Sequence, residues 1–383
     1  MEKSLPSNHP DIASAYNNIG CAYGNLGEYN KGLEYHQKAL KIQEESLPSN
    51  HPNIANTYHN IRYAYGKLGE YEKELEYFKK ALKIQEESLS SNHPDIASAY
   101  NDIGIVYGKL GEYEKELEYL KKALKIEEET LPSNHLDIAI TYNNIGCAYG
   151  NLGEYEKFLE YNQKALKIME ENLSFNHPYI VGIYNDIGYV YGKLGEYEQQ
   201  LEYYQRVLRI QEESLPLIHS DLMELYYNIS LTYADINDLE QSFIWCKKAT
   251  VCGHIQGMVK LSKHLIEGKG CKQNYEEAFE WLNKAYTLGN AIATNNLGWM
   301  YLHGYGCKKD IWKAIELFKV VADSETPSKA SCKHLGEIYS GLEDTGDIAL
   351  YDVKQALYYY QKAKDLGCED LEDTINKLLL KDK

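Results

Sequence analysis

The chain has 383 residues and carries 57 acidic against 40 basic side chains, which gives a formal net charge of −17. This charge argues against nucleic acids and anionic membrane surfaces as partners, because both are bound through basic patches. The N-terminal residues lack the apolar run of a signal peptide, and no stretch approaches a membrane span of about 20 apolar residues, so we expect a cytoplasmic protein without a membrane partner.

A 42-residue repeat organises the first two thirds of the chain. It starts at a histidine in each copy: His9, His51, His93, His135, His177 and, in degraded form, His219. A fixed period of this length is typical of a solenoid, in which each repeat buries its apolar face only by stacking on its neighbours. The copies are numbered repeats 1 to 6 in chain order.

Two helices are predicted in each repeat. Pro10 and Asp11 are typical of a helix start, because proline lacks the N–H that this position leaves unpaired and an acid complements the helix dipole. We expect helix A from Pro10 to about Gly24, a turn at residues 25–27 and helix B from about Glu28 to Ser46. Ion pairs at i,i+4 on helix B, such as Glu76–Lys80, predict a solvated outer face.

Residues at fixed places in the repeat resemble the tetratricopeptide repeat: Tyr16, Ile19-Gly20, Ala22-Tyr23, Gly27, Tyr29, Ala39-Leu40 and Ile42. The 42-residue length with HPDIA, YGxLGEY and KALKI is similar to the long repeats of kinesin light chains, over about residues 1–250. No heptad region of the kind that joins a light chain to its motor precedes the repeats, so motor attachment is not predicted. The predicted fold class is all-α, an α-solenoid forming a right-handed superhelix of helix-turn-helix repeats.

Helix B departs from the family pattern at one position. A small residue is expected there and repeat 1 has Gly32, but the next four repeats have larger residues: Glu74, Glu116, Phe158 and Gln200. We expect these side chains to widen or shift the contact between helices A and B.

After about Thr250 the period shortens to 36 residues. Ala291–Ser324 resembles a Sel1-like repeat, with Leu297-Gly298 and Gly304-x-Gly306 in the expected order, and similar patterns precede and follow it. We predict six tetratricopeptide repeats over 1–250, three Sel1-like repeats over 251–368, with extra loop residues near 344–348, and a C-terminal capping helix and tail over 369–383. The join near 251–256 lacks a Pro/Ser-rich linker, so continuous stacking is expected.

Little in the sequence indicates catalysis. Histidines one repeat apart would lie at least about 8–10 Å from one another, too far to share a metal ion through bonds of about 2 Å, so each is interpreted as a helix N-terminal residue. Gly268–Lys272 and Gly304–Lys308 lack phosphate-loop spacing and are interpreted as inter-helix loops. The eight scattered cysteines form no Cys-x-x-Cys pair and are expected to be free thiols. We predict no enzyme activity, no cofactor and no metal.

Two polar ladders mark a candidate groove, because helix A lines the concave face in tetratricopeptide arrays. One position of helix A holds Asn17, His59, Asn101, Asn143 and Asn185, and the next holds Asn18, Asn60, Asp102, Asn144, Asp186 and Asn228. Asparagine is a mediocre helix former, but its amide can pair with the main chain of an extended peptide. The alternative is that asparagine is tolerated on a wet face or was copied by duplication.

Glycine and basic residues continue this face. A glycine ladder (Gly24, Gly66, Gly108, Gly150 and Gly192) either admits another backbone closely or lies near the helix end, and both interpretations stay open. Lys67, Lys109 and Lys193 form a basic strip with Arg62, which is either solvated or attracts acidic ligand residues. Tyr63 and Tyr189 could form aromatic walls for an anchor side chain. The resemblance to kinesin light chains implies a preference for aromatic–acidic segments.

The predicted function is a scaffold or adaptor that binds extended peptides, acidic ones included, along repeats 1–5, with the Sel1-like end as a second docking surface. The predicted binding residues are Asn17, Asn18, Asn60, Arg62, Tyr63, Lys67, Asn101, Asp102, Lys109, Asn143, Asn144, Asn185, Tyr189 and Lys193. One alternative is the regulatory or sensory tail of a larger signalling or NTPase protein, because MEKSLPSN parallels the repeat end at Gln43–Asn50. Another is a self-associating rod; the partner's identity and the oligomeric state stay open.

Overall fold

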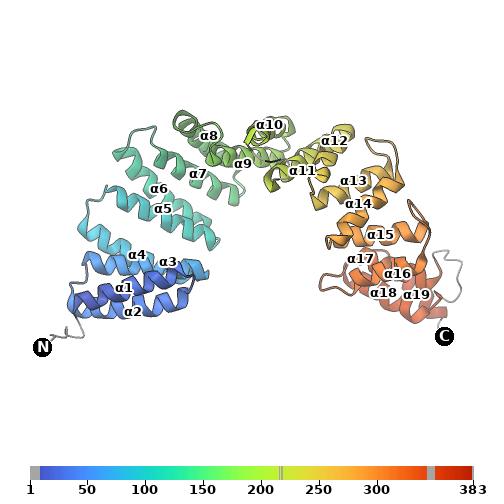
Figure 1. Cartoon of the computed structure of the whole chain (residues 1–383), viewed down its shortest axis with the longest axis horizontal. Helices are drawn as coiled ribbons and strands as arrows, with labels where there is room; N and C mark the ends of the chain where they lie inside the picture. Colours follow the sequence, from blue (N-terminus) through green and yellow to red (C-terminus); the bar gives the residue numbers. More distant parts are fainter. Residues whose placement is uncertain (1–8, 215, 217–218, 343–349, 382–383) are drawn as a thin grey trace. The chain divides into compact units, whose positions relative to one another are not determined.

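A computed structural model describes residues 9–214, 216, 219–342 and 350–381, in which every regular element is a helix (Figure 1). The chain forms two compact units, Met1–Gly195 and Glu196–Lys383. Each unit is a stack of helix pairs, which confirms the predicted α-solenoid. The repeat-like residues 1–8 and the extra loop at 344–348 lie outside the described residues. No helix of the described part is long and apolar enough to cross a membrane.

The N-terminal unit contains nine helices within the described residues. The A helices of repeats 1 to 5 are α1 (Pro10–Asn25), α3 (Pro52–Leu68), α5 (Pro94–Lys109), α7 (Leu136–Asn151) and α9 (Pro178–Leu194). The B helices of repeats 1 to 4 are α2 (Tyr29–Ser46), α4 (Tyr71–Ser88), α6 (Tyr113–Thr130) and α8 (Tyr155–Asn172). The bounds predicted for repeat 1 are therefore confirmed to within one residue.

The repeated histidine caps helix A. In repeat 1, His9 Nδ1 accepts the backbone N–H of Asp11 at 3.2 Å, and the histidines of repeats 2 to 6 accept the equivalent N–H at 3.1–3.3 Å. This bond satisfies one of the amides that a helix start leaves unpaired. The histidine is thus a helix N-terminal residue, as predicted. At the other end of helix A, Gly27 has a φ of 78°, a left-handed conformation that glycine adopts without strain.

Neighbouring repeats are joined by an apolar contact and a recurring hydrogen bond. Isoleucines of helix A are fully buried against the preceding repeat, including Ile61 and Ile103. On the rim, Tyr100 donates its hydroxyl hydrogen to Glu86 at 2.8 Å, and Tyr142 does the same to Glu128 at 2.8 Å. Each bond links helix A to helix B of the preceding repeat. Because the bonded residues recur every 42 positions, neighbouring repeats stack in the same register.

The C-terminal unit continues the alternation of helices. Its helices are α10 (Tyr197–Ser214), α11 (Ser220–Asp235), α12 (Leu239–Val251), α13 (Ile255–Glu267), α14 (Tyr275–Thr287), α15 (Ala291–His303), α16 (Ile311–Ala322), α17 (Lys329–Ser340), α18 (Val353–Asp365) and α19 (Glu372–Lys381). Across the change of period, Cys246 of α12 shares one buried cluster with Met258 and Leu261 of α13. The expected continuous stacking at this join is therefore observed.

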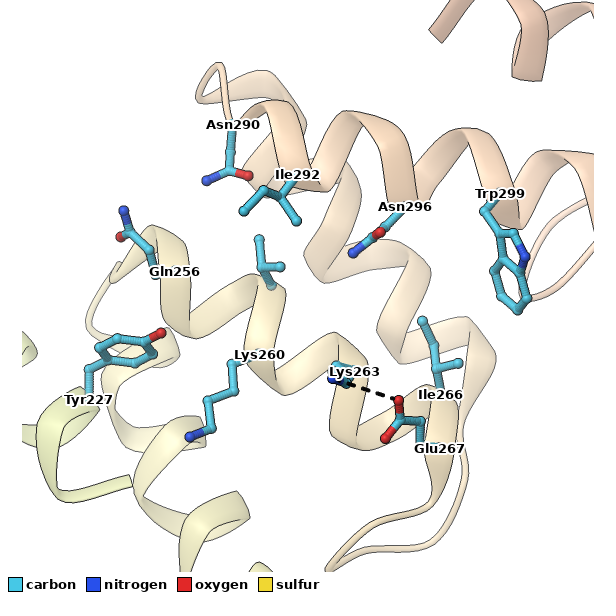
Figure 2. Close-up of a pocket in the computed structure, with 11 residues that line it drawn as sticks. Tyr227, Gln256, Lys260, Lys263, Ile266, Glu267, Asn290, Ile292, Asn296 and Trp299 are labelled. Carbon is cyan, nitrogen blue, oxygen red and sulfur yellow. Dashed lines mark ion pairs between the residues drawn. The ribbon is translucent and has the colours of Figure 1, made fainter. Parts of the chain in front are cut away.

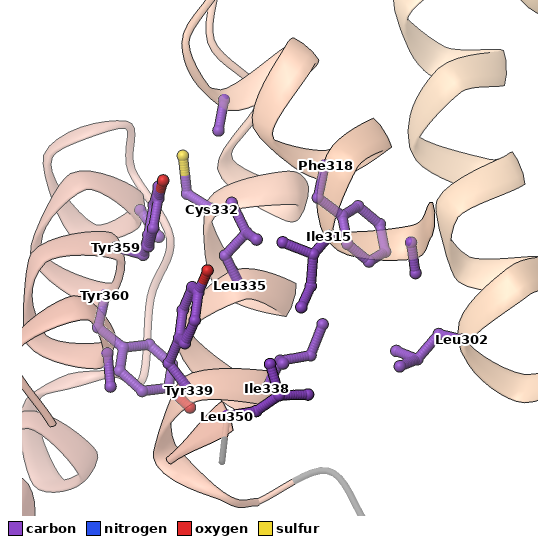
Figure 3. Close-up of a cluster of buried hydrophobic side chains, with 14 of the residues drawn as sticks. Leu302, Ile315, Phe318, Cys332, Leu335, Ile338, Tyr339, Leu350, Tyr359 and Tyr360 are labelled. Carbon is purple, nitrogen blue, oxygen red and sulfur yellow. The ribbon is translucent and has the colours of Figure 1, made fainter. Parts of the chain in front are cut away.

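A second buried cluster holds the end of the C-terminal unit together (Figure 3). The rings of Phe318 on α16 and Tyr360 on α18 are fully buried in it. A Cβ at Gly336 would lie 2.8 Å from the Tyr360 ring, so glycine at this place of the repeat admits a large aromatic neighbour. Leu371 and Leu378 contact the same cluster, and α19 thereby covers the apolar end of the stack.

The glycine-rich stretches are inter-helix loops, as predicted. Gly270 has a φ of 72°, and a Cβ there would lie 1.9 Å from the Leu239 carbonyl oxygen. Gly306 is equivalent, with a φ of 67° and a Cβ position 2.2 Å from the Tyr275 carbonyl oxygen. Both glycines therefore let a loop lie directly on the first turn of the preceding B helix.

Candidate functional site

All fourteen predicted binding residues lie on the A helices α1, α3, α5, α7 and α9. The A helices of neighbouring repeats contact one another, α1 with α3 and α5 with α7, which places them on the inner side of the stack. The two polar ladders therefore share one face, but their members differ in what they contact.

Asn17 is bound inside the stack. Its Oδ1 lies 2.9 Å from His36 Nδ1, and its Nδ2 donates to Thr57 Oγ1 at 2.6 Å, which in turn donates to Gln43 Oε1 at 2.7 Å. Burial lowers the pKa of His36 to about 4, so the imidazole is neutral at physiological pH and donates to Asn17. Both ends of this amide are engaged within the chain, and a structural role replaces the predicted contact with a peptide.

Three further ladder residues are also engaged. Asn143 Nδ2 donates to Asn162 Oδ1 on helix B at 2.6 Å, and Asn144 Nδ2 donates to Asn101 Oδ1 on the neighbouring A helix at 3.0 Å. In contrast, the amides of Asn18, Asn60 and Asn185 make no hydrogen bond to other residues of the described part. Among the asparagines of the predicted binding residues, these three amides are left to face a ligand.

Arg62 does not contribute a free charge to the predicted basic strip. Its Nε donates to His59 Nδ1 at 2.9 Å, its guanidinium lies 3.7 Å from the Asp102 carboxylate, and it stacks on the Phe78 ring at 3.6 Å from the ring centre. Burial raises the pKa of Asp102, an effect that the Arg62 charge partly offsets. Lys109 lies 4.0 Å from the Glu74 carboxylate. Arg62, Asp102 and Lys109 therefore form part of an internal charge network.

The glycine ladder has a function that neither interpretation of the sequence included. Three of its glycines admit the large B-helix side chain of their own repeat, because a Cβ there would lie 2.6–2.9 Å from that side chain: Gly66 with Glu74, Gly108 with Glu116, and Gly150 with Phe158. The pairing of glycine with a large residue explains how helices A and B stay close despite the departure from the family pattern.

Repeat 1 lacks this pairing, and a cavity results. Gly24 and Gly32 both lack a side chain, and a Cβ at Gly24 would have no neighbour within 4 Å. The cavity has a volume of about 220 Å³ and is lined by His36 from α2 and by Asn60 and Tyr63 from α3. Two of the predicted binding residues are thus brought to the edge of one hollow.

Exposed aromatic and basic residues flank the inner face. The Tyr63 and Tyr189 rings are each 55% exposed. Lys67 Nζ lies 5.3 Å from the centre of the Tyr63 ring, and Lys193 Nζ lies 4.9 Å from the centre of the Tyr189 ring. No carboxylate of the described residues forms an ion pair with Lys67 or Lys193. These two tyrosine–lysine pairs, in repeats 2 and 5, are exposed and stay predicted binding residues.

One apolar member of this face was missed. The position of Tyr63 holds an apolar residue in each repeat of the N-terminal unit: Cys21, Tyr63, Ile105, Cys147 and Tyr189. Ile105 is 36% exposed, although β-branched apolar residues are usually buried. The 42-residue spacing alone would have identified it.

A larger cavity in the C-terminal unit was also missed (Figure 2). It has a volume of about 520 Å³ and lies between α11, α13 and α15, with Lys260, Ile292, Asn296 and Trp299 among its lining residues. Lys260 and Asn296 each directly precede a buried leucine of their A helix, as Asn60 precedes the buried Ile61. The second polar ladder therefore continues into the Sel1-like repeats, and this alignment is the signal that could have revealed the cavity.

The described residues contain no group of three or more side chains arranged to hold a metal ion. All eight cysteines are free thiols. Burial raises the pKa of Cys147 and of Cys246 to about 12, which keeps both thiols protonated and unreactive.

Family models match nearly the whole chain. One tetratricopeptide repeat model matches residues 11–87, 63–129 and 95–171, a second matches 181–214 and 224–250, and the Sel1 repeat model matches 255–290, 291–323 and 331–368. The chain is built of tetratricopeptide and Sel1 repeats. Repeats of both families generally serve in protein–protein interaction. No curated protein matches this repeat chain.

Solved structures are similar to this chain over half of its length or more. Nearly identical TPR-like repeats of a kinesin light chain from Podosopora anserina are 22% identical over 54% of this chain and 98% of that chain, with a TM-score of 0.47. A Sel1 repeat protein from Oxalobacter formigenes is 24% identical over 58% of this chain and 84% of that chain, with a TM-score of 0.42. The apo form of RapI is 18% identical over 72% of this chain and 96% of that chain, with a TM-score of 0.50. At 18% identity, the likeness to RapI indicates a common fold alone.

Proposed function

We propose that this tetratricopeptide and Sel1 repeat protein is a non-enzymatic scaffold that binds extended peptide segments along the inner helices of its N-terminal unit. The families to which its repeats belong generally serve in protein–protein interaction. The inner helices of the described residues offer exposed aromatic and amide side chains that suit a peptide ligand.

The observation that carries the proposal is the cavity of about 220 Å³ between repeats 1 and 2. Tyr63 gives it an exposed aromatic wall and Asn60 an amide without a partner in the described residues. An apolar ligand side chain would fill the hollow while the Asn60 amide pairs with the ligand main chain. Recognition of this kind needs one anchor side chain and is tolerant of the surrounding sequence.

The proposed ligand is acidic near its anchor residue. Lys67 is exposed beside Tyr63 and has no carboxylate partner in the described residues, and Lys193 repeats this arrangement beside Tyr189. In a chain with a net charge of −17, isolated ammonium groups on one face favour anionic segments by complementary potential. Arg62 and Lys109 are left out of this proposal because both are paired internally.

The test uses the full chain and random peptides displayed on phage, with enriched peptides remade and measured by fluorescence polarisation. We expect enriched peptides to be acidic and to lose at least about tenfold in affinity for a Tyr63→Ala, Lys67→Glu double variant. Lys83→Glu is the matched control, because Lys83 is exposed on helix B of the same repeat and makes the same change of charge. Equal binding by both variants would show that peptides do not use the inner face.

The alternative of a regulatory tail rests on the repeat-like residues 1–8, which lie outside the described residues. It makes the same prediction for the inner face, so the peptide measurements apply to both functions. Finding the repeats joined to an effector domain in one gene product would decide in its favour.

A further inference from the structure

The cavity of about 520 Å³ in the C-terminal unit has apolar walls and includes Lys260 among its lining residues (Figure 2). Ile292 and Trp299 project from α15, and Ile292 is 62% exposed although it is a large aliphatic residue. The Trp299 ring packs against Tyr305 with ring centres 5.0 Å apart and against His303 at 4.8 Å. The indole is thus held in place and presents a fixed apolar wall.

Lys260 supplies the amine. It is half-buried on α13, and its Nζ donates to the Ser230 carbonyl oxygen at 3.2 Å. Burial lowers the pKa of Lys260, and no carboxylate of the described residues forms an ion pair with it. The Asp235 charge offsets this lowering only in part, so the desolvated ammonium of Lys260 gains from an anionic ligand.

Basic residues outnumber acidic ones among the side chains next to this amine. Lys263 lies 4.0 Å from Glu267, and Lys269 lies 2.7 Å from the same carboxylate, so one acid is shared by two bases. The charged residues that line the cavity are Lys260, Lys263 and Glu267, so the lining carries a positive excess, in contrast to the acidic chain as a whole. Charge complementarity selects an anionic occupant.

Amides complete the lining. The side chains of Gln256 and Asn296 lie among the residues of the cavity. Gln256 makes no side-chain hydrogen bond to other described residues, and Asn296 Nδ2 donates none of its hydrogens there. Side-chain amides without partners can hydrogen-bond to the main chain of an extended peptide segment.

We infer that this cavity binds an extended peptide segment of a partner protein, with a large apolar side chain against Ile292 and Trp299 and an acidic side chain on Lys260. The inference rests on the proposed scaffold function and adds a second, separate site with its own ligand chemistry. Apolar burial gives the affinity, and the ion pair with Lys260 fixes the direction in which the peptide lies.

The test measures full-length protein by fluorescence polarisation against acetylated and amidated nonapeptides that carry one tryptophan and one aspartate at varied spacing. We expect one spacing to bind at least about tenfold more tightly than matched peptides with asparagine for aspartate or alanine for tryptophan. Ile292→Glu should abolish this preference, because it places a carboxylate in the cavity at a position whose exposure tolerates substitution. Val320→Glu, at a residue 56% exposed on α16 and outside the cavity, should not change it.

Lys260→Glu gives an independent readout, because it should transfer the preference from the aspartate peptide to one with lysine in that place. The inference is overturned if no peptide shows the preference, if Ile292→Glu binds as the unaltered chain does, or if the charge exchange fails. Binding that responds to Tyr63→Ala and not to Ile292→Glu would overturn this inference alone. Binding by no peptide to either site would overturn the scaffold proposal as well.

Discussion

Repeats 2 and 3 place a glutamate at the same point of helix B, and the two carboxylates have different surroundings. Glu74 lies against Gly66, with Lys109 at 4.0 Å and the Arg62 charge nearby. Burial raises the pKa of Glu74, but both basic groups lower it in turn. The carboxylate of repeat 2 is therefore part of a neutralised network.

Glu116 has the same glycine opposite, Gly108, and none of the charges. The residue equivalent to Lys109 is Asn151, and the residue equivalent to Arg62 is Gly104. Glu116 is only 7% exposed, its Oε2 has no hydrogen-bond partner in the described residues, and burial raises its pKa to about 7. The carboxyl group of repeat 3 is consequently half protonated near neutral pH.

This difference shows that local sequence does not determine the protonation state of a buried acid in this stack. Residues 69–77 and 111–119 are identical, so the near helix neighbours of the two glutamates differ only four residues further on, where Phe78 stands in repeat 2 and Leu120 in repeat 3. The neutralising groups of Glu74 come from the preceding A helix and from the next repeat. In a solenoid, a repeat's electrostatics therefore depend on its neighbours as much as on itself.

The largest effect is expected for Glu116→Phe, which copies the Phe158–Gly150 contact of repeat 4. A pKa rise from 4.5 to about 7 corresponds to a cost of about 3 kcal/mol for the ionised form at pH 8. Phe158 is buried beside Gly150 at 2.9 Å from the Cβ position, so the same ring has room beside Gly108. We expect the free energy of unfolding at pH 8 to rise by about 3 kcal/mol in urea titrations followed by circular dichroism.

Glu74→Phe is the matched control for this substitution. It should give no gain, because Lys109 and Arg62 then lose a partner while the apolar contact is the same. Equal stabilisation by both substitutions would mean that neighbouring charges do not distinguish the two repeats.

The pH dependence of Glu116→Gln sharpens the same comparison. Between pH 4.5 and 7 the folded chain holds a proton on Glu116 that the unfolded chain has lost, so stability falls as the pH rises through this window and is level above it. Glutamine does not titrate, so the variant should match the unaltered chain at pH 5 and exceed it by about 2 kcal/mol at pH 8. Burial also raises the pKa of Glu127 to about 7, but that group is present in both proteins and its contribution cancels. If the variant and the unaltered chain differ in stability by the same amount at every pH, Glu116 does not have a raised pKa.

Asn151→Lys transplants the neutralising charge of repeat 2 into repeat 3. A lysine there should approach Glu116 as Lys109 approaches Glu74, and we expect about 1 kcal/mol of stabilisation at pH 8 and almost none at pH 5. Asn25→Lys makes the same change at the last residue of α1, which no B helix of the described residues precedes, so no glutamate equivalent to Glu116 lies beside it. This control removes the general benefit of a base at a helix C-terminus. Equal gains in the two variants would assign the effect to the helix dipole.

Much of the fold could be predicted from the sequence, because period and helix signals are local. The 42-residue spacing gave the repeats, and the His-Pro start and the glycine at the end of helix A gave helix bounds to within one residue. The glycine ladder was harder to interpret, because its partner is a side chain on another helix. Pairing Gly66 with Glu74 and Gly150 with Phe158 needs the geometry of the A–B contact as well as the period.

The candidate site was predicted only in part, for a related reason. Position on helix A indicated which side chains share a face, but it did not indicate which of them bind within the chain. Asn17 and Asn60 look alike in sequence, and only Asn17 has His36 and Thr57 within reach. The larger cavity was missed because its lining combines three helices across the change of period.

The smallest change in stability is expected at a polar contact between helix B and the next helix A, which is complete in one repeat and lacks its donor in the next. Gln43 Oε1 accepts from Thr57 at 2.7 Å, whereas the equivalent Gln85 faces Ala99 and its Oε1 is buried without a hydrogen-bond partner in the described residues. Ala99→Thr should supply the missing donor and stabilise the chain by about 0.5 kcal/mol in urea titrations. Ala99→Val has the same shape without the hydroxyl group, so it should be less stable than the threonine variant. If valine stabilises as much as threonine, the gain comes from packing, and the unsatisfied oxygen of Gln85 costs the fold little.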